Sequence, residues 1–588
     1  MTNFKTPGVY IREISRLPAS VAPVATAVPA FVGYTERALK KGEDVAFTPV
    51  RITSLLEYEE IFGRPFPEQF GISLSDGPQN SEAPTVEISG DISPYILHYC
   101  MQLYFANGGG PCYIVSVGIY EDDLQDASVS SDALAEGLKA LENEDEPTIL
   151  VIPETVKLED DGDRKTLYDA MLDQCADLKD RFAILDAMVG SDKNPFADGN
   201  EFRDQVGMNN LMYGGAYYPS LKTLIRYAFN EWDLSISDTR SAQKFDTWSL
   251  RDIREGVISE QGVIVLEELA DLREGDTLTI NGNIFTFYKD DGEGDIEIKA
   301  TPSPTATEIA KAIDGTEGFS ATRVTGEATV LVNMVGPDAS ETALEIEFTA
   351  APPEEEEEEE EEREPFSISI IEKTEILAPD KSLYNLIKKE LDKRRVILYP
   401  SSAMAGLYAK VDRDRGVWKA PANVSVSFVS EPTVLVTHEQ QEPLNVDPGT
   451  GKSVNVIRKF NQKGTLVWGA RTLAGNDNEW RYVPVRRLFI FLEESIKKAT
   501  EPVVFEPNDA NTWSKTKGMI ENFLTGLWRE GALAGATTQD AFFVKVGLGQ
   551  TMSAIDILEG RLIIEVGVAA VRPAEFIILK FMHKLQES

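Results

Sequence analysis

Three neighbouring residues, Gly451, Lys452 and Ser453, come nearest to a chemical motif in this chain of 588 residues. A glycine followed by lysine and serine ends a phosphate-binding loop, in which backbone N–H groups hold phosphate oxygens. The full motif also needs a glycine at the position of Val446, and residues 447–449, Asp-Pro-Gly, are typical of a turn rather than of a preceding strand. We therefore expect no nucleotide or other cofactor here.

Residue types that bind metals or act as nucleophiles are few and scattered. They are His98, His438, His583, Cys100, Cys112 and Cys175. Their spacings match no zinc motif, and three cysteines cannot all pair in disulfides. Buried, reduced thiols are the simpler interpretation. We expect no catalytic residues and no metal site, and hence a protein that is not an enzyme.

The charge of the chain restricts its partners. It has 57 basic and 97 acidic residues and a net charge of −40, and removing the nine glutamates of residues 354–362 still leaves −31. Such an acidic surface repels nucleic acids and anionic lipids. The start lacks the apolar segment of a secretory signal, and no stretch of about 18 apolar residues could span a membrane. We expect a cytoplasmic product without a signal peptide, release by lysis if the product leaves the cell, no nucleic-acid partner and no membrane insertion.

Residues 1–30 form an extended amino-terminal arm, because four prolines between Pro7 and Pro29 exclude a continuous helix. Such a terminus is either a loose tail or a strand that docks on another sheet. The apolar Val9, Tyr10 and Ile11 favour the strand.

Residues 31–256 alternate short apolar runs with amphipathic ones. We expect strands at 30–34, 112–117, 148–152 and 182–186, and helices at 94–107, 132–142 and 164–179. Strands that alternate with helices require crossover connections, so this part predicts an α/β domain with a largely parallel sheet.

Residues 257–353 predict a small β-rich insertion. Residues 276–288 are a strand, an Asn-Gly turn and a second strand, which is a strong hairpin signal. The glutamate run that follows predicts an acidic, solvated linker at 354–365, with a calcium site as the alternative. A helix at 381–393 and a strand at 395–399 then return the chain to the α/β domain over residues 366–400. The insertion therefore interrupts one domain.

Residues 401–572 predict a carboxy-terminal domain, followed by an arm at 573–588. Within it we expect helices at 486–498 and 511–529 and strands at 542–546 and 561–568. Pro573 breaks the chain before the arm. The expected fold class is α/β (α+β) with several domains: a core built from amino- and carboxy-terminal parts, extended arms, and an inserted β-rich outer domain.

Several short motifs resemble one known family. They are TPGVYI at 6–11, VWGARTLAG at 467–475, WRYVPVRR at 480–487, FEPND at 505–509 and RPAEFI at 572–577. In this order they resemble the sheath proteins of contractile injection systems, machines built like contractile phage tails. The likeness is greatest to the extracellular type, such as antifeeding prophage and virulence-cassette particles.

The resemblance implies a structural subunit that polymerises with itself in six-fold rings around an inner tube, with baseplate and terminal cap proteins as further partners. In that family the sheath assembles in an extended, metastable state and contracts to drive the tube through a target membrane. A non-contractile baseplate or capsid-like component is the alternative. An acid-rich hydrolase is a third hypothesis, which no motif supports.

The sequence also predicts which residues link the subunits. Extended arms can add strands to the sheets of neighbouring subunits through main-chain hydrogen bonds. The predicted arm residues are Val9, Tyr10, Ile11, Glu575, Phe576, Ile577, Ile578 and Leu579. The predicted acceptor strands, in a sheet of the carboxy-terminal domain, contain Val467, Trp468, Phe542, Phe543 and Val544. Lys515, Lys517 and Arg529 are predicted to face the inner tube from the helix 511–529, whose apolar stripe predicts packing in the domain core as the alternative.

Overall fold

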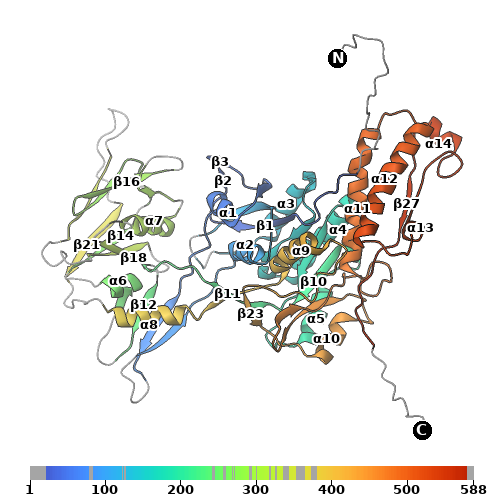
Figure 1. Ribbon diagram of the computed structural model, residues 1–588. Coiled ribbons are helices and arrows are strands. Elements are labelled where there is room, and N and C mark those ends of the chain that lie inside the picture. The colour runs from blue at the N-terminus through green and yellow to red at the C-terminus, as the bar shows by residue number, and fades with distance from the viewer. Residues whose placement is uncertain are drawn as a thin grey trace, which may run out of the picture.

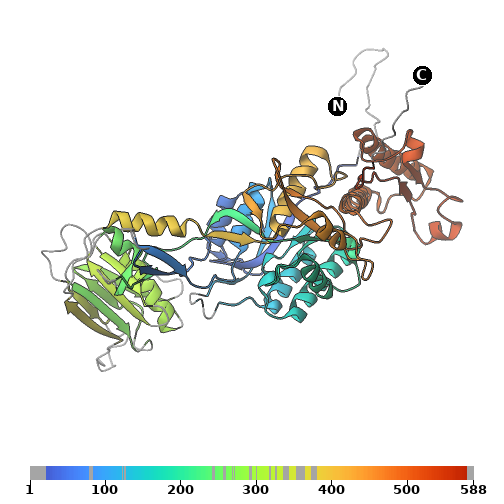
Figure 2. The ribbon, with the colours of Figure 1, turned by 90° about the horizontal axis from the view of Figure 1, so that it is seen from below.

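The computed structural model describes residues 21–578 except 78–83, 122–123, 125–126, 233, 241–245, 256–259, 268, 270–271, 290–293, 300, 315, 317–318, 325–327, 335–343, 352–364 and 373–379. The molecule is elongated. The inserted domain lies at one end, a central α/β domain in the middle and the carboxy-terminal domain at the other end (Figures 1 and 2). Val9, Tyr10, Ile11 and Leu579 lie outside the described residues, as does the glutamate run.

The central domain is built on an eight-stranded sheet in the order β25-β24-β10-β9-β8-β1-β7-β4. Its strands are β1 (Pro29–Thr35), β4 (Val50–Ile52), β7 (Cys112–Ile119), β8 (Ile149–Val151), β9 (Phe182–Asp186), β10 (Gly214–Tyr218), β24 (Val454–Phe460) and β25 (Gly464–Val467). The pairings from β24 through β10, β9, β8 and β1 to β7 are all parallel, and only the two edge strands are antiparallel. The predicted α/β domain with a largely parallel sheet is confirmed.

Helices cover both faces of this sheet. They are α1 (Leu55–Phe62), α2 (Leu97–Ala106), α3 (Ser131–Ala140), α4 (Asp161–Leu178), α5 (Pro195–Asp204), α9 (Ser401–Arg415) and α10 (His438–Asn445). Helix α2 packs on α9 and helix α3 on α4, and the central strand β1 contacts both α2 and α3. Every residue of β1 is accordingly buried, which is typical of a parallel strand between two helical layers.

Local signals set the helix ends. The side chain of Asp160 caps the first turn of α4, and Lys179 ends that helix in the left-handed conformation. Helix α2 ends just before Gly108, whose φ of +94° suits glycine. The three glycines at 108–110 therefore end a helix, as the sequence predicts.

The central sheet takes β24 and β25 from a part of the chain that the sequence assigns to the carboxy-terminal domain. Residues 401–467 are therefore part of the central domain and not, as the sequence predicts, of the carboxy-terminal domain. The reason is that β24 pairs in parallel with β10 and its buried residues join the central core. An apolar strand carries no mark of the sheet that it will join, so sequence alone does not place this boundary.

The described residues of the inserted domain form two four-stranded sheets and one helix, α7. Its elements are β14 (Glu260–Leu266), β15 (Thr277–Ile280), β16 (Asn283–Tyr288), β17 (Ile296–Glu297), α7 (Pro302–Asp314), β18 (Phe319–Arg323), β19 (Thr329–Met334), β20 (Ile346–Thr349) and β21 (Phe366–Glu372). The predicted hairpin is present as β15 and β16 around Asn281 and Gly282, both with positive φ. Strand β21 pairs with β14 over seven residues. The insertion therefore continues to residue 372, beyond the predicted acidic linker, which connects two strands of the same domain.

Two small sheets join the insertion to the central domain. One contains β5 (Gly71–Ser75), β6 (Thr85–Ser89), β12 (Ser235–Asp238) and β13 (Asp246–Ser249), and it shares a core with α6 (Leu250–Glu255) and α8 (Lys381–Leu391). The other contains β11 (Leu221–Arg226), β22 (Arg395–Leu398) and β23 (Val429–Pro432). The return to the α/β domain begins with α8 and β22, close to where the sequence predicts these elements.

The carboxy-terminal domain contains α11 (Val483–Thr500), α12 (Ala510–Glu530), α13 (Thr538–Ala541), β26 (Phe542–Lys545), α14 (Ala554–Leu558) and β27 (Glu565–Val568). Its core joins Leu488 and Phe491 of α11 to Ile520, Phe523 and Leu524 of α12. Val483 and Ile490 on the same helix α11 belong to the central core instead. Helix α11 thus contributes side chains to the cores of both domains.

Candidate functional site: the carboxy-terminal domain and its junction

The described part of the carboxy-terminal arm is apolar and exposed. Phe576, Ile577 and Ile578 are 71%, 79% and 81% exposed. Three consecutive large apolar side chains in water are unfavourable, and such exposed apolar patches are typical of interaction surfaces. They have the character expected of an arm that binds a neighbour.

Glu575, directly before these residues, is held firmly. Its carboxylate accepts hydrogen bonds from Arg471 Nη2 at 2.6 Å and Nε at 2.9 Å, from Asn445 Nδ2 at 2.8 Å and from Tyr482 Oη at 3.0 Å. Partial burial alone would raise the pKa of Glu575, but the hydrogen bonds from Arg471 and Asn445 and the charge of Arg471 outweigh it and hold the pKa below its usual value. The root of the arm is therefore fixed by an ionised carboxylate.

The partner of this carboxylate is itself rigid. The Arg471 side chain is 4% exposed and also donates to the carbonyls of Asn445 and Gly475. Asn455 of β24 accepts from the backbone N–H of Arg471 and donates to its carbonyl. Because both ends of Arg471 are fixed, the position of Glu575 is defined relative to the central sheet.

Two further arginines join α11 to the central domain. The guanidinium of Arg486 lies between the rings of Tyr213 and Trp480, at 5.0 and 4.5 Å from their centroids. Arg487 donates two hydrogen bonds to Asp412 of α9, at 2.7 and 3.0 Å, and both side chains are almost fully buried. The arginines of the motifs at 467–475 and 480–487 thus fix the junction of two domains.

The strands β26 and β27 form a two-stranded sheet, in which Phe542, Phe543, Val544 and Lys545 pair with residues 565–568. Among the described residues neither strand has a second neighbour. Phe543 is 44% exposed, whereas Val544 is buried in the domain core. A two-stranded sheet is marginal alone and both of its edges offer main-chain donors and acceptors.

Val467 and Trp468 do not belong to this sheet. Val467 is the last residue of β25, pairs with Ile457 and is fully buried in the central core. Trp468 stacks near Phe460 at the same edge, with 4.6 Å between ring centroids. The predicted acceptor residues therefore lie in two different sheets, because residues 461–464 form a tight turn that folds this run back on β24. Val467 and Trp468 are thus not in one sheet with Phe542 to Val544, and the acceptor role of either sheet stays a prediction.

The three cations predicted to face the tube lie on helix α12 but not on one patch. The stripe of Met519, Ile520, Phe523, Leu524 and Leu527 is buried, as the alternative interpretation states. Lys515 and Lys517 are two residues apart and flank this stripe on opposite sides. Lys517 lies 3.7 Å from Glu521, and Lys515 and Arg529 are exposed. The orientation of α12 towards a tube stays a prediction.

A second apolar surface lies on the loop between β26 and β27. Leu548, Ile555 and Leu558 are all more than half exposed. The neighbouring Phe505 is fully exposed, and Asn508 joins its segment to the loop by donating to the carbonyl of Arg561 at 3.0 Å. The sequence analysis did not single out this surface, since only the exposure of these side chains distinguishes them from core residues.

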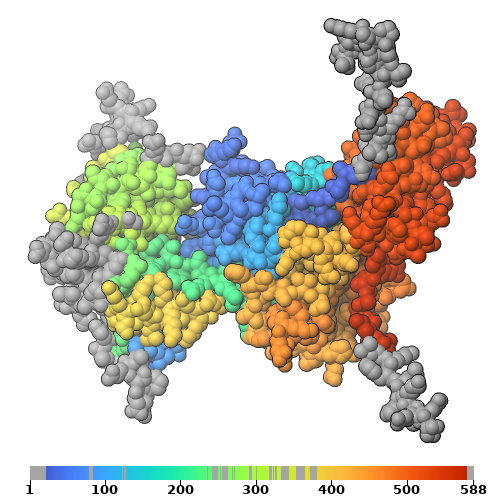
Figure 3. Space-filling view, viewed as in Figure 1, coloured from blue at the N-terminus to red at the C-terminus, as the bar shows by residue number. Residues whose placement is uncertain are grey.

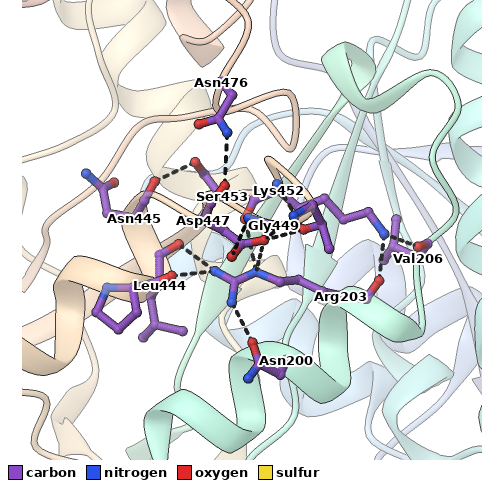
Figure 4. Close-up of polar contacts among 12 residues, drawn as sticks. Asn200, Arg203, Val206, Leu444, Asn445, Asp447, Gly449, Lys452, Ser453 and Asn476 are labelled. Carbon is purple, nitrogen blue, oxygen red and sulfur yellow. Dashed lines mark hydrogen bonds and ion pairs between the residues drawn. The ribbon is translucent and has the colours of Figure 1, made fainter.

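The Gly451-Lys452-Ser453 sequence has a structural role (Figure 4). The Lys452 ammonium lies 2.6 Å from the carbonyl of Arg203 and also donates to that of Val206, at the end of α5. Arg203 in turn donates to the carbonyls of Lys452 and Pro443. Because Lys452 is buried and its ammonium is bound to two backbone carbonyls, it is not placed to bind a phosphate.

The three cysteines are free and buried, and burial raises the pKa of each thiol. Over the described ranges, no group of three or more histidine, cysteine, aspartate or glutamate side chains is arranged for a metal ion. No helix in this same part of the chain is long and apolar enough to cross a membrane.

Sequence reasoning named Glu575 as an arm residue but missed what holds it. Arg471 and Glu575 each lie in a short motif that the sequence presents, at 467–475 and 572–577. Their separation of 104 residues left nothing to connect them.

Comparison with known proteins gives a consistent result. Residues 475–583 match the family described as phage tail sheath C-terminal domain. No curated protein matches the chain. Among solved structures, the chain is similar to the anti-feeding prophage (AFP) baseplate, 6-fold symmetrised, with 27% identity, a TM-score of 0.52, and 99% of this chain and 100% of the other covered.

Two sheath structures are similar to the same extent. The AFP helical sheath in the contracted state has 26% identity and a TM-score of 0.52, with 99% of this chain and 100% of the other covered. The sheath complex of an extracellular contractile injection system, PVC, in the contracted state has 25% identity and a TM-score of 0.51, with 99% of each chain covered. The chain thus matches the phage tail sheath C-terminal domain at its carboxyl end and is similar along its whole length to sheath proteins of phage-tail-like contractile injection systems.

Proposed function

We propose that this protein is the repeating subunit of a contractile sheath and that its subunits are linked by strand exchange between arms and carboxy-terminal domains. This linkage is inferred from two features of the same chain. One is the sheet β26–β27, which has only two strands, and the other is an exposed apolar arm. A strand from a neighbour would pair the free edges of the sheet, and the apolar arm would lose its contact with water.

This contact joins two different surfaces, so each subunit can accept one neighbour and be accepted by another. A head-to-tail contact that does not close generates a helical polymer. The solved relatives are a helical sheath, a sheath complex and a baseplate, which supports assembly of this chain with itself and association with a baseplate. Stacked six-fold rings, an inner tube and a terminal cap protein are finer parts of the same proposal.

Contraction requires two packings of the same subunit separated by a kinetic barrier. Two of the similar solved structures are sheaths in a contracted state, which favours a contractile sheath over a non-contractile component. The central and carboxy-terminal domains share α11 and three buried arginine contacts, which supports their movement as one body. The arms beyond Val21 and Glu575 would then absorb the change.

The elongated shape gives each end of the subunit a role. The inserted domain is furthest from the carboxy-terminal domain, so we place it on the outside of the sheath, where added bulk does not obstruct assembly. The carboxy-terminal domain, with α12, would face the inner tube. No catalytic role is part of this proposal, since the solved relatives are sheath and baseplate proteins.

The test is electron microscopy of the full chain and of a chain truncated from Ala574, each co-expressed with the inner-tube protein of the same system. We expect helical tubes from the full chain and soluble, folded subunits after truncation. A matched control deletes residues 354–362, which should leave the tubes intact. Tubes that persist without the arm would refute strand exchange through that arm, and a full chain that never polymerises on its tube would refute the sheath assignment.

A further inference from the structure

The chain crosses from one domain to another immediately before the arm. After β27, Ala569 and Val571 run beside Ala532 and Ala534, with the Ala534 N–H donating to the carbonyl of Ala569 at 2.7 Å. These residues belong to the carboxy-terminal domain. Four residues after Val571, Glu575 contacts Asn445 and Arg471 of the central domain. Figure 3 shows this last described segment in dark red lying against the orange residues of the central domain.

The start of the described chain crosses in the opposite direction. Val21 is 3% exposed and packs in the core of the carboxy-terminal domain. The backbone N–H of Val24 donates to Ser495 Oγ of α11 at 3.2 Å. Val28 then enters the central domain, where its N–H donates to Thr148 Oγ1 at 2.9 Å. The amino-terminal arm is therefore attached to the carboxy-terminal domain, although the chain that follows it enters the central domain. The carboxy-terminal arm is attached to the central domain, although the chain before it lies in the carboxy-terminal domain.

We propose that Glu575 is the positioning residue that anchors the carboxy-terminal arm to the central domain of its own subunit. The apolar side chains of Phe576 to Ile578 then leave from a fixed point beside Arg471. The geometry supports this, because the Glu575 carboxylate accepts hydrogen bonds from three separate segments of the chain. The donors are Asn445, Arg471 and Tyr482.

The anchor has a consequence that rests on the proposed function. If the arm adds to a neighbour's carboxy-terminal domain, a displacement of one central domain is transmitted to the next subunit through Glu575 and not through β27. Without the anchor, the segment after Val571 would absorb part of that displacement, and neighbouring subunits would be less tightly coupled.

The experiment measures the arm on the soluble, full-length subunit. Since all three native cysteines are buried, two introduced cysteines can be spin-labelled selectively. One label replaces Ile578 and the other replaces the exposed Glu439 of α10. We expect a narrow distance distribution in the otherwise unchanged chain, at least a twofold broader one in Glu575→Ala, and an intermediate one in Glu575→Gln, which keeps the shape and loses the charge.

Two controls separate anchoring from general stability. Glu565→Ala removes an exposed carboxylate of the same domain, 3.5 Å from Lys545, and should leave the distribution narrow. A label pair at positions 439 and 515 reports the distance between the central and carboxy-terminal domains, and its distribution should not change in Glu575→Ala. Equal widths with and without Glu575, or broadening of the Glu439–Lys515 distribution as well, would overturn the proposal.

This test is independent of polymerisation. A full chain that forms no tubes would refute the sheath assignment and leave the distance result standing. A full chain that forms tubes while Glu575→Ala forms identical tubes of equal resistance to shear would show that the coupling consequence is wrong.

Discussion

The buried ion pair between Arg487 and Asp412 offers a quantitative test of how the two domains are joined. Its two hydrogen bonds measure 2.7 and 3.0 Å, and the side chains are 3% and 4% exposed. Arg487 also donates to the carbonyl of Thr26 at 2.8 Å and lies 4.5 Å from the centre of the Tyr408 ring. The pair thus connects α11 with α9 and with the segment that leads to β1.

The perturbation is Asp412→Ala. It leaves the Arg487 charge in a buried place with the Thr26 carbonyl and the Tyr408 ring as remaining partners. Removing one member of a buried pair costs about 3–5 kcal/mol, because the other charge keeps its desolvation penalty. Replacing both members, in Asp412→Leu with Arg487→Met, should cost much less than either single change, since it removes both charges.

The assay is native-state hydrogen exchange of peptides from α11 and α9, because global unfolding of a multi-domain chain is not two-state. Asp412→Ala should speed exchange in α11 by at least 100-fold. The neighbouring Asp414→Ala breaks an exposed pair with Arg413 and should change exchange by less than about threefold. If Asp412→Ala behaved like Asp414→Ala, or if the double variant were the least stable of all, the reasoning about this junction would fail.

Three further predictions concern the cores and the surface. Burial raises the pKa of Asp186 to about 7, so the folded chain keeps a proton that the unfolded chain releases near pH 4. The free energy of unfolding therefore falls as pH rises from about 4 to 7. Asp186→Asn, which still accepts the N–H of Ser401, should therefore be more stable than the natural chain at pH 8 by about 2–4 kcal/mol and not at pH 4, as native-state hydrogen exchange of peptides from β9, corrected for intrinsic rates at the two pH values, would show. Leu524→Ala should lower the stability of the carboxy-terminal domain by about 2–5 kcal/mol, since Leu524 is fully buried, and thermal melts in which that domain unfolds no earlier would contradict this. Charge reversal in Lys515→Glu with Lys517→Glu should reduce co-assembly with the inner tube while melting is unchanged, and unaltered co-sedimentation would remove these residues from the tube interface.

The sequence predicts the elements well because each carries a local signal. Helices α3 and α4 begin after the capping residues Ser130 and Asp160, α2 ends before the glycines at 108–110, and the hairpin of β15 and β16 follows from Asn281-Gly282. The parallel sheet follows from the alternation of strands and helices. All of these depend on residues within about 20 positions of one another.

What could not be predicted depends on long-range pairing. Nothing local shows that β24 completes the sheet begun by β1, or that β21 continues a sheet after a run of glutamates. The same limit applies to the site. Arg471 and Glu575 are conspicuous residues separately, but only the fold shows that they form one contact. Val467 was misplaced for the same reason, since an apolar strand beside a family motif does not reveal its sheet.

The inserted domain enters and leaves the rest of the chain at nearly the same place. The first residue of β14 pairs with the last of β21, and the N–H of Asp380, at the start of α8, donates to the carbonyl of Ile253 in α6 at 2.9 Å. A polypeptide whose two ends meet in this way behaves as a cassette. Residues 256–379 could be exchanged for a short turn, or for an unrelated domain with adjacent termini, without a change of register in the central sheet. If the inserted domain lies on the outside of the sheath, as we propose, it can diversify, or be engineered to display a binding module, independently of the polymer beneath it.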